Sequence, residues 1–290
     1  MTVVGAGSVG SVLSLMLKRR GHSIVSVVSK TRKSARVLAA RVRCRIAGDD
    51  VSLVSPATTF LLITTPEHAV EQTALLIASL DLPFGRMAVA HTSGALSSDV
   101  LAPLAARGAR IFSFHPIQTF PVSGHLSISL SSMNGVWYGF EGPKTSRAFA
   151  RALAGILRGK FLEIPKEKKI LYHLACVFAS NYPVVLLGAV DRLAQQVSGG
   201  DLTPFQKLFE SSGQNAFQMG ASKALTGPLS RGSVGIVHRH MAELGSKEPE
   251  LLGMYSALGL FALEILKEKE VLAVNEINTL ESLLAGDNGR

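Results

Sequence analysis

The chain has 290 residues and a formal net charge of +9, with 30 lysines and arginines against 21 aspartates and glutamates. A hydrophobic fraction of 47% and a charged fraction of 18% are typical of a globular protein of one large or two medium domains. The two cysteines, Cys44 and Cys176, exclude a disulfide framework and a four-cysteine zinc site, and they favour a reducing compartment such as the cytoplasm.

The positive charge is concentrated at the start of the chain, where no acidic residue precedes Asp49 and basic residues recur from Lys18 to Arg45. An organelle transit peptide is disfavoured, because its removal would also remove the phosphate-binding motif described below. A nucleic-acid surface is disfavoured too, because no aromatic residue lies among these cations to stack on bases. We therefore expect a site for an anionic cofactor and no nucleic-acid partner.

Short apolar runs alternate with stretches of helical periodicity through the first half of the chain. Residues 8–20 form one predicted helix that ends at Gly21, residues 32–41 form a basic one, and Pro66 opens another at its first turn. This alternation predicts an α/β fold with a doubly wound parallel sheet. The strands are expected at residues 2–4, 24–28, 43–47, 60–64, 87–90, 111–114, 137–140 and 161–164.

The pattern changes after Pro165, because long helical segments without a convincing strand continue to Leu284. We predict two domains, residues 1–164 and residues 165–290, which pack directly because no linker separates them. The stretch 171–190 carries no formal charge and is long enough to span a bilayer. Polar residues interrupt it, so we expect a buried helix in a soluble protein and no membrane.

The motif Gly5-Ala6-Gly7-Ser8-Val9-Gly10 matches G-x-G-x-x-G, follows a predicted strand and opens a predicted helix. In this pattern Gly5 allows a tight turn, Gly7 lets the backbone approach a pyrophosphate, and Gly10 lets the helix pack closely on the strand. The helix N-terminus offers free N–H groups and a positive dipole end to phosphates. An ordinary glycine turn is the weaker alternative, so we predict a dinucleotide-binding Rossmann domain.

The end of the second predicted strand distinguishes between dinucleotides. NAD-binding proteins place an Asp or Glu there for the ribose 2′-hydroxyl, and no carboxylate is near this position in the sequence. A hydroxyl with several cations suits a 2′-phosphate instead, so the expected cofactor is NADP(H). The alternative is that these cations are solvated charges on the next helix. The expected contacts of the 2′-phosphate are Ser29, Lys30, Arg32 and Lys33.

Several motifs together resemble one protein family. They are Gly5–Gly10, Gly21-His22, Thr64-Thr65-Pro66, His91–Ala95, Ser113–Pro116, Ser180-Asn181-Tyr182, Leu225–Pro228 and Arg231-Gly232. The family comprises Rossmann-like proteins with a C-terminal helical domain of unknown function, often assigned as NADP oxidoreductases. It is similar to pyrroline-5-carboxylate reductase, ketopantoate reductase and the β-hydroxyacid dehydrogenases in domain order. The resemblance implies hydride transfer to or from a small C=O or C=N compound, and an all-α domain similar to the C-terminal domain of 6-phosphogluconate dehydrogenase.

Two positions depart from what the resemblance implies. An Asp is expected shortly before the strand at residues 60–64, where Thr59 stands, and another is expected after Arg231-Gly232, where Ser233 stands. If that second Asp has a chemical role, this chain differs from the family in substrate or activity.

Polar side chains follow the predicted strands at the carboxyl edge of the sheet, where open α/β sheets bind ligands. Ser93 and Gly94 precede a helical stretch, so their N–H groups are candidates to hold a substrate carboxylate. His115 is either a general acid–base or part of a structural His-Pro turn, and His91 is structural or a cofactor neighbour. Cofactor contacts are expected from Thr64, Thr65, Pro66, His91 and Thr92.

A polar stripe marks the first helix after Pro165, where Lys169, Tyr172, His173, Cys176 and Ser180 share one face. A lysine whose pKa is lowered by burial can donate a proton when hydride reaches a carbonyl, so Lys169 and His173 are the candidate proton donors. The resemblance implies the same, since a helix of this placement carries a catalytic Lys and, one turn later, an Asn in the β-hydroxyacid dehydrogenases. The alternative places Lys169 on the surface.

The match to that dehydrogenase helix is partial, because His173 stands one turn after Lys169 and Asn181 lies two turns further. Asn181 is a candidate to orient the substrate, or it caps carbonyls freed by Pro183. In a later loop, Thr226 and Arg231 are candidate substrate contacts, although Arg231 could equally form a loop ion pair. His238 and His240 point apart on their helix, so we predict no metal site.

The sequence thus predicts an NADP-dependent oxidoreductase that reduces a small carbonyl or imine compound in a cleft between the two domains. A non-catalytic NADP(H)-binding sensor or scaffold is the alternative. The apolar stretch at 171–190 is too long for a small helical domain to cover alone, so we also expect a homodimer through the C-terminal helices.

Overall fold

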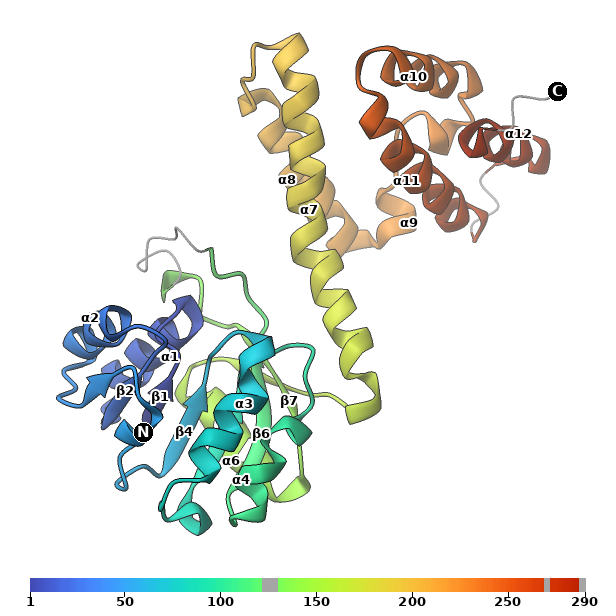
Figure 1. Ribbon diagram of the computed structural model, residues 1–290. Coiled ribbons are helices and arrows are strands. Elements are labelled where there is room, and N and C mark those ends of the chain that lie inside the picture. Colours follow the sequence, from blue (N-terminus) through green and yellow to red (C-terminus); the bar gives the residue numbers. More distant parts are fainter. Residues whose placement is uncertain (122–129, 269–271, 287–290) are drawn as a thin grey trace. The chain divides into compact units, whose positions relative to one another are not determined.

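The computed structural model describes residues 1–121, 130–268 and 272–286, and its first half is an eight-stranded sheet with the order β3-β2-β1-β4-β5-β6-β7-β8 (Figure 1). Neighbouring strands are parallel except β6 and β7. This confirms the predicted doubly wound sheet. The strands are β1 (Thr2–Val4), β2 (Ser26–Val28), β3 (Ala47–Gly48), β4 (Phe60–Ile63), β5 (Ala88–His91), β6 (Arg110–Pro116), β7 (Trp137–Glu141) and β8 (Lys160–Glu163).

Helices cover both faces of this sheet, because successive side chains of a strand point to opposite faces. Phe60 and Leu62 of β4 pack in one apolar cluster with α1 and α6, whereas Leu61 and Ile63 pack in another with α3 and α4. Continuous apolar strands are therefore buried on both sides, as a parallel sheet requires. The helices are α1 (Ser8–Arg19), α2 (Arg32–Val42), α3 (Glu67–Ala78), α4 (Ala102–Ala106) and α6 (Lys144–Ile156).

The second half is helical, as predicted, but the boundary between the compact units differs from the one expected at residues 164 and 165. The units divide between Tyr182 and Pro183, inside α7 (Lys169–Val197), because the first turns of α7 contact the sheet. The second unit has a core of leucines and Val237. Its further helices are α8 (Thr203–Met219), α9 (Ala221–Ala224), α10 (Val234–Lys247), α11 (Pro249–Lys267) and α12 (Val274–Ala285).

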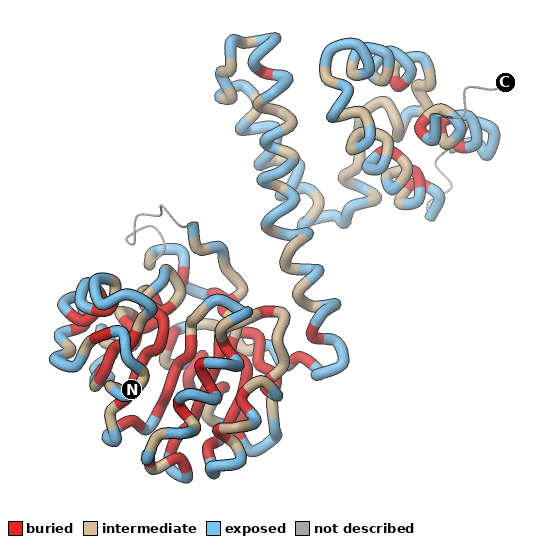
Figure 2. Tube along the Cα trace, viewed as in Figure 1, coloured by how far each residue is buried: buried red, intermediate tan, exposed pale blue. Residues whose placement is uncertain are grey.

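Helix α7 is not buried within the chain, so the expectation of a buried helix is wrong for a single copy. Its apolar side chains are largely exposed among the described residues, for example Phe178 at 65% and Val184 at 70% (Figure 2). By length and composition, the helical stretch from Lys166 to Val197 and helix α11 are long and apolar enough to cross a membrane. A polar stripe on one face interrupts the apolar character of α7, as shown below.

The start of α1 lies unusually close to the ends of β1 and β4. A Cβ on Gly10 would lie 2.0 Å from the Gly5 carbonyl oxygen and 2.4 Å from Thr64 Oγ1, whereas a Cβ on Gly7 would meet no atom within 4 Å. Gly5 has φ +112°, and a Cβ there would lie 2.6 Å from the Thr64 backbone. Gly5 and Gly10 therefore allow the close packing of α1 against the ends of β1 and β4. Gly7 is not needed for this packing, and the space beside its Cα stays open.

This difference predicts that two alanine substitutions change the stability of the protein to different extents. We expect Gly10→Ala to lower the free energy of unfolding by about 1–3 kcal/mol, the usual cost of overpacking. Gly7→Ala should change it by less than about 1 kcal/mol, because a lost helix-capping preference opposes a smaller entropy of the unfolded chain. Urea denaturation measures both values, and equal stability of the two variants would contradict this packing.

Candidate functional site

A cleft of about 470 Å³ lies at the carboxyl edge of the sheet, where β1 stands between β2 and β4. This is the point at which the strand order reverses, and ligands bind there in open α/β sheets. The cleft brings together the loops after β1, β2, β4 and β5 with residues from β6 and α7. Of the residues expected at the cofactor, it is lined by Gly5, Ala6, Gly7, Ser8, Val9, Ser29, Lys30, Thr64, Thr65, Pro66 and Thr92.

Hydrogen bonds fix the glycine loop at the floor of this cleft. Thr64 Oγ1 donates to the Gly5 carbonyl oxygen at 2.6 Å, and the Ala6 N–H donates to Ser29 Oγ at 3.2 Å. Helix α1 then begins with no acidic residue in its first turn and no side-chain cap. Its first N–H groups and the positive end of its dipole therefore face the cleft without a carboxylate from this turn.

The start of α2 forms a second cationic region beside the glycine loop. Thr31 caps this helix through the Ser34 N–H, and Thr31, Ser34, Lys33 and Arg41 help to line a hollow of about 260 Å³. The expectation that no carboxylate lies nearby is wrong, because Asp49 follows β3 and pairs with Arg32 at 3.2 Å. Both side chains are exposed, so the pair is worth little and leaves the region cationic.

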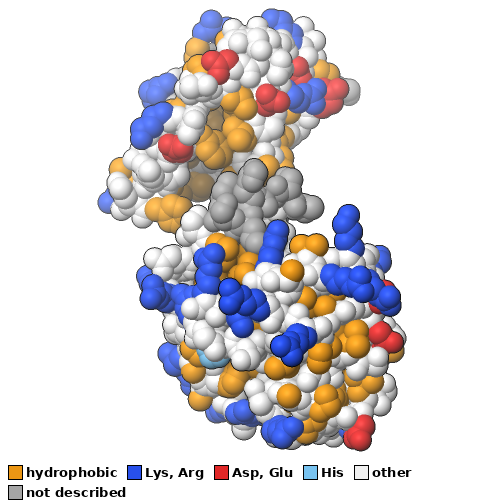
Figure 3. All heavy atoms as spheres, turned by 90° about the vertical axis from the view of Figure 1, so that its left-hand side faces the viewer, with side chains coloured by type: hydrophobic (Ala, Val, Ile, Leu, Met, Phe, Trp, Pro, Cys, Tyr) orange, Lys and Arg blue, Asp and Glu red, His pale blue; other side chains and the backbone are white. Residues whose placement is uncertain are grey.

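Lysine and arginine side chains are more frequent than acidic ones on the face of the first unit that carries α2 (Figure 3). The exposed cations of α2 include Arg32, Lys33, Arg36 and Arg41. Cations at the first turn of a helix oppose the helix dipole, so they are favourable only where an anion compensates them. Arg32 and Lys33 lie in this first turn, whereas Arg41 lies in the last turn of α2.

His91 supports the loop after β5 and does not line the cleft. Its side chain is fully buried, its Nδ1 lies 3.2 Å from the Ser93 N–H that donates to it, and its Nε2 lies 3.1 Å from the Ser97 carbonyl oxygen. Burial lowers the pKa of His91 to about 4, with Lys169 adding to the effect. The ring is therefore neutral and structural, and the cofactor contact expected of His91 stays a prediction.

Ser93 also has a different role from the one expected. Its Oγ accepts the N–H groups of Ala95 and Leu96 at 3.1 and 3.0 Å and donates to the Glu67 carboxylate. The Ser93 N–H, which donates to His91, is thus occupied, whereas the contact expected of the Gly94 N–H with a substrate carboxylate stays a prediction. The sequence analysis missed Glu67, which lines the cleft at the first residue of α3.

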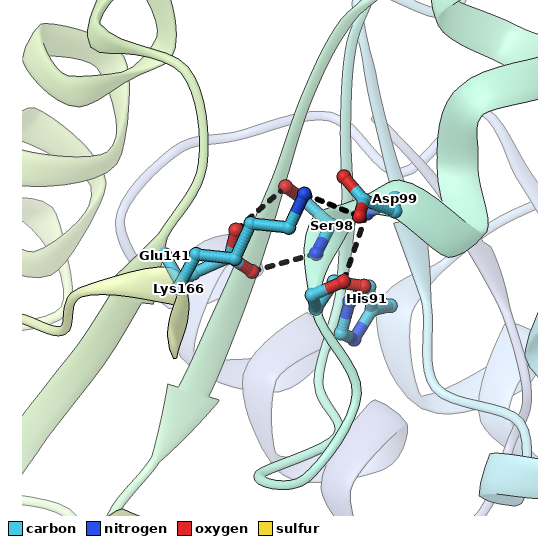
Figure 4. A network of polar contacts seen from close by, with 6 residues as sticks. His91, Ser98, Asp99, Glu141 and Lys166 are labelled. Carbon is cyan, nitrogen blue, oxygen red and sulfur yellow. Dashed lines mark hydrogen bonds and ion pairs between the residues drawn. The ribbon is translucent and has the colours of Figure 1, made fainter. Parts of the chain in front are cut away.

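A polar network holds the next part of this loop against β7 and the start of α7 (Figure 4). Glu141, the last residue of β7, is buried and accepts from the Ser98 N–H at 2.6 Å and the Ser98 hydroxyl at 2.9 Å. Asp99 pairs with Lys166 at 2.5 Å, one turn before α7. Glu141 was also missed, since a single acid at a strand end gives no signal in the sequence.

The polar stripe of α7 faces the ends of β5 and β6. Lys169 is only 2% exposed, and its Nζ donates to Ser113 Oγ at 2.7 Å. Tyr172 Oη lies 2.6 Å from His115 Nδ1, with the two rings nearly perpendicular at 84°. His173 and His115 both line the cleft, whereas Lys169 lines a separate hollow behind the loop after β5. Lys169 is thus buried, as the proton-donor hypothesis required, but it does not reach the cleft.

The two histidines of the cleft meet at Gly94. A Cβ on Gly94 would lie 2.7 Å from His173 Cδ2 and 3.1 Å from His115 Nε2, so only glycine leaves both rings in place. Burial, together with the charges of Lys169, His173 and His91, lowers the pKa of His115 to about 4. His115 is therefore a neutral imidazole at neutral pH, which can donate or accept a hydrogen bond in the cleft.

Burial lowers the pKa of Lys169 to about 8, against the opposing effects of Glu141, Cys176 and Glu67. Asn181 is exposed, and the Ser180 hydroxyl contacts both its Oδ1 at 3.0 Å and the Cys176 carbonyl oxygen at 2.7 Å. Asn181 therefore does not line the cleft that the structure describes, and its role as a substrate ligand stays a prediction.

The remaining candidates lie elsewhere. Thr226 and Arg231 belong to the second unit, at the loop and short 3-10 turn before α10, so their predicted contacts with substrate stay a prediction. Ser233 is the N-cap residue of α10, where an Asp would cap the helix. Thr59 is exposed at the amino end of β4, the edge of the sheet opposite to the cleft. Neither of these two residues lines the cleft.

Solved structures share this fold at low sequence identity. A candidate NADP oxidoreductase from Bacteroides fragilis is 22% identical, with a TM-score of 0.77, covering 91% of this chain and 97% of its own. A Thermotoga maritima protein is 24% identical with a TM-score of 0.70, covering 92% and 98%. A reductive aminase from Aspergillus terreus in complex with NADPH is 17% identical with a TM-score of 0.56, covering 100% and 94%. No curated protein sequence matches the chain.

Family models match two successive parts of the chain. Residues 1–116 match a Rossmann-like domain, and residues 136–261 match a domain of unknown function, DUF2520. This confirms the resemblance drawn from the sequence motifs, and the second match includes strands β7 and β8 as well as helices of the second half. The chain consists of a Rossmann-like domain followed by a DUF2520 domain.

Proposed function

We propose that the protein is an NADP(H)-dependent oxidoreductase that acts on a small carbonyl or imine compound. The observation that carries the proposal is the cleft at the reversal of strand order, which combines a glycine loop with two neighbouring histidines. The fold is shared with NADP oxidoreductases and dehydrogenases, among them a reductive aminase in complex with NADPH. Bound NADPH would supply a hydride to the substrate carbon.

The residues of the cleft fit such a dinucleotide. The space above Gly7 and the N-terminus of α1 suit a pyrophosphate, since a Cβ would intrude there and the N–H groups face outward. Lys30 lines the cleft, and Lys33 and Thr31 line the hollow at the start of α2, where a 2′-phosphate would find cations and a hydroxyl. Arg32 would contribute less to binding of the 2′-phosphate, because its charge is partly neutralised by the ion pair with Asp49.

The histidines supply the polar groups at the substrate end of the cleft. His115 and His173 are placed to contact a carbonyl oxygen or imine nitrogen, and His173 in its protonated form would supply the proton. Burial keeps His115 neutral, and Lys169, which lies behind the loop, adds to this effect through its charge. The carboxylate of Glu67 in the cleft, together with the engaged N–H groups of Ala95 and Leu96, favours a neutral substrate over a 2-oxo acid.

We also propose that a second copy covers the exposed apolar side chains of α7 and the helices after it, and that the dimer is cytoplasmic. Val184 and Val197 of α7 and Phe217 of α8 are 70%, 79% and 94% exposed. Lipid is a poorer occupant for α7, because Asp191 and Arg192 interrupt its apolar surface. Two free cysteines suit a reducing compartment.

The cofactor proposal predicts a preference for NADPH that depends on Lys33. Wild-type protein should bind NADPH more tightly than NADH, and Lys33→Ala should weaken NADPH about 10- to 100-fold, the effect of losing one charge-assisted hydrogen bond. NADH binding should not change. Isothermal titration calorimetry measures all affinities, with Arg19→Ala, which removes an exposed cation at the far end of α1, as the control. Tighter binding of NADH than NADPH by the wild type would contradict the proposal.

The catalytic proposal predicts turnover that depends on the cleft histidines. Ketones, cyclic imines and 2-oxo acids are screened for NADPH consumption, and His173→Ala should then lower turnover about 100-fold, the scale for a lost general acid. NADPH affinity should stay within a few-fold. His22→Ala removes an exposed histidine at the amino edge of the sheet and is the control. Tight NADPH binding without consumption in the presence of any compound would favour the sensor alternative.

The assembly proposal predicts a mass of twice the 30.8 kDa chain in detergent-free solution. Multi-angle light scattering at micromolar concentration measures it. Val184→Lys should shift the protein towards the monomer, because a charge on the apolar face of α7 opposes its burial. The control is Leu75→Lys, which makes the same kind of change at an exposed residue of α3 in the first unit and should leave the mass unchanged. A monomeric wild type, or a protein that requires detergent, would rule the dimer out.

A further inference from the structure

Tyr172 occupies a confined position between α7, β6 and β7. Its hydroxyl lies 2.6 Å from His115 Nδ1, and the ring centroids are 5.7 Å apart at 84°. On the other side, a Cβ on Gly139 of β7 would lie only 2.6 Å from the Tyr172 hydroxyl. The phenol is thus held in a slot that only glycine leaves open, with its hydroxyl directed at one nitrogen of the histidine.

The direction of the hydrogen bond between Tyr172 and His115 follows from the acceptors that the Tyr172 hydroxyl can reach. Burial raises the pKa of the Tyr172 phenol above its ordinary range, so the hydroxyl keeps its proton and is a donor. Cys176, one turn further along α7, also interacts with the phenol. A thiol sulfur is a weak acceptor and an imidazole nitrogen is a good one, so the proton points to His115 Nδ1. In a neutral imidazole that accepts at Nδ1, the ring proton is on Nε2.

We propose that Tyr172 is a positioning residue that fixes His115 as the Nε2–H tautomer, with this N–H directed into the cleft beside Gly94 and His173. The inference rests on the proposed function in one respect, since the Nε2–H would then donate a hydrogen bond to the carbonyl oxygen or imine nitrogen of the substrate. No proton leaves His115 in this role. The ring stabilises charge that develops on the substrate atom, as oriented donors do in other active sites.

The groups around His115 favour the neutral ring from several elements. Lys169 and His173 act from α7 and His91 from β5, and the positive charge that each carries when protonated lowers the pKa of His115. The nearby carboxylates, Glu141 of β7 and Glu67 of α3, act on Lys169. With burial as the largest cause, the pKa of His115 is about 4. An accepted hydrogen bond at Nδ1 stabilises the neutral form further, and its loss raises this pKa.

Nitrogen-15 NMR of histidine-labelled full-length protein tests the proposal without substrate or cofactor. Two-bond proton–nitrogen correlations between pH 4 and pH 9 report which ring nitrogen carries the proton, and His115→Gln assigns the signals. Wild-type His115 should carry its proton on Nε2 and stay neutral down to about pH 5. In Tyr172→Phe the ratio of the two tautomers should fall about five- to tenfold, the effect of one lost hydrogen bond, and the titration midpoint should move to higher pH.

Tyr138→Phe is the matched control. It removes another buried phenol hydroxyl of the first unit, one that has no hydrogen-bond partner among the described residues, and it should leave the His115 signals unchanged. A proton on Nδ1 in the wild type overturns the proposal, and this result does not depend on whether Tyr172→Phe folds. A folded Tyr172→Phe protein with wild-type His115 signals also overturns it. A failed search for a substrate leaves these spectra unaffected and bears on the proposed function alone.

Discussion

The proposed substrate end of the cleft depends on the contacts that compensate one buried charge, the ammonium group of Lys169. A lysine that is 2% exposed costs free energy unless its charge is compensated. Ser113 Oγ accepts from it at 2.7 Å, and the carboxylates of Glu141 and Glu67 favour its charged form. This compensation anchors the first turn of α7 on the sheet. The next turn of the helix then delivers Tyr172 to His115 and His173 to Gly94.

Most of the fold could be predicted from local patterns, because strands that are buried on both faces, such as β4 and β5, are continuous apolar runs. Contacts between residues far apart in the sequence could not. Glu141 binds Ser98 across 43 positions, and Asp49 reaches Arg32 only because β3 ends beside the start of α2. Nor does any local pattern show that His91 accepts the Ser93 N–H and that Ser93 Oγ accepts those of Ala95 and Leu96.

The cleft is built in two ways, and this explains which predictions could be made. Its cofactor half consists of backbone, glycines and short hydroxyl side chains, whose spacing along the chain is itself the signal. The half proposed to bind substrate consists of side chains that α7 brings to the sheet from more than fifty positions away, as in the pair of His115 and Tyr172. Periodicity could place Tyr172 and His173 on one face of a helix, but only the packing of α7 decides what that face contacts.

The same periodicity explains why α7 resembles a membrane span by composition. Hydropathy averaged along a helix mixes its faces, and in the first half of α7 the polar residues Lys169, Tyr172 and His173 gather on the face that packs against the sheet. The opposite face carries apolar residues such as Leu171 and Phe178, and these residues give the helix its high mean hydropathy. A bilayer would surround both the polar and the apolar face of α7 with hydrocarbon, whereas a protein partner would cover only the apolar face. A helix with one face committed to a polar cluster therefore favours a protein partner for the other.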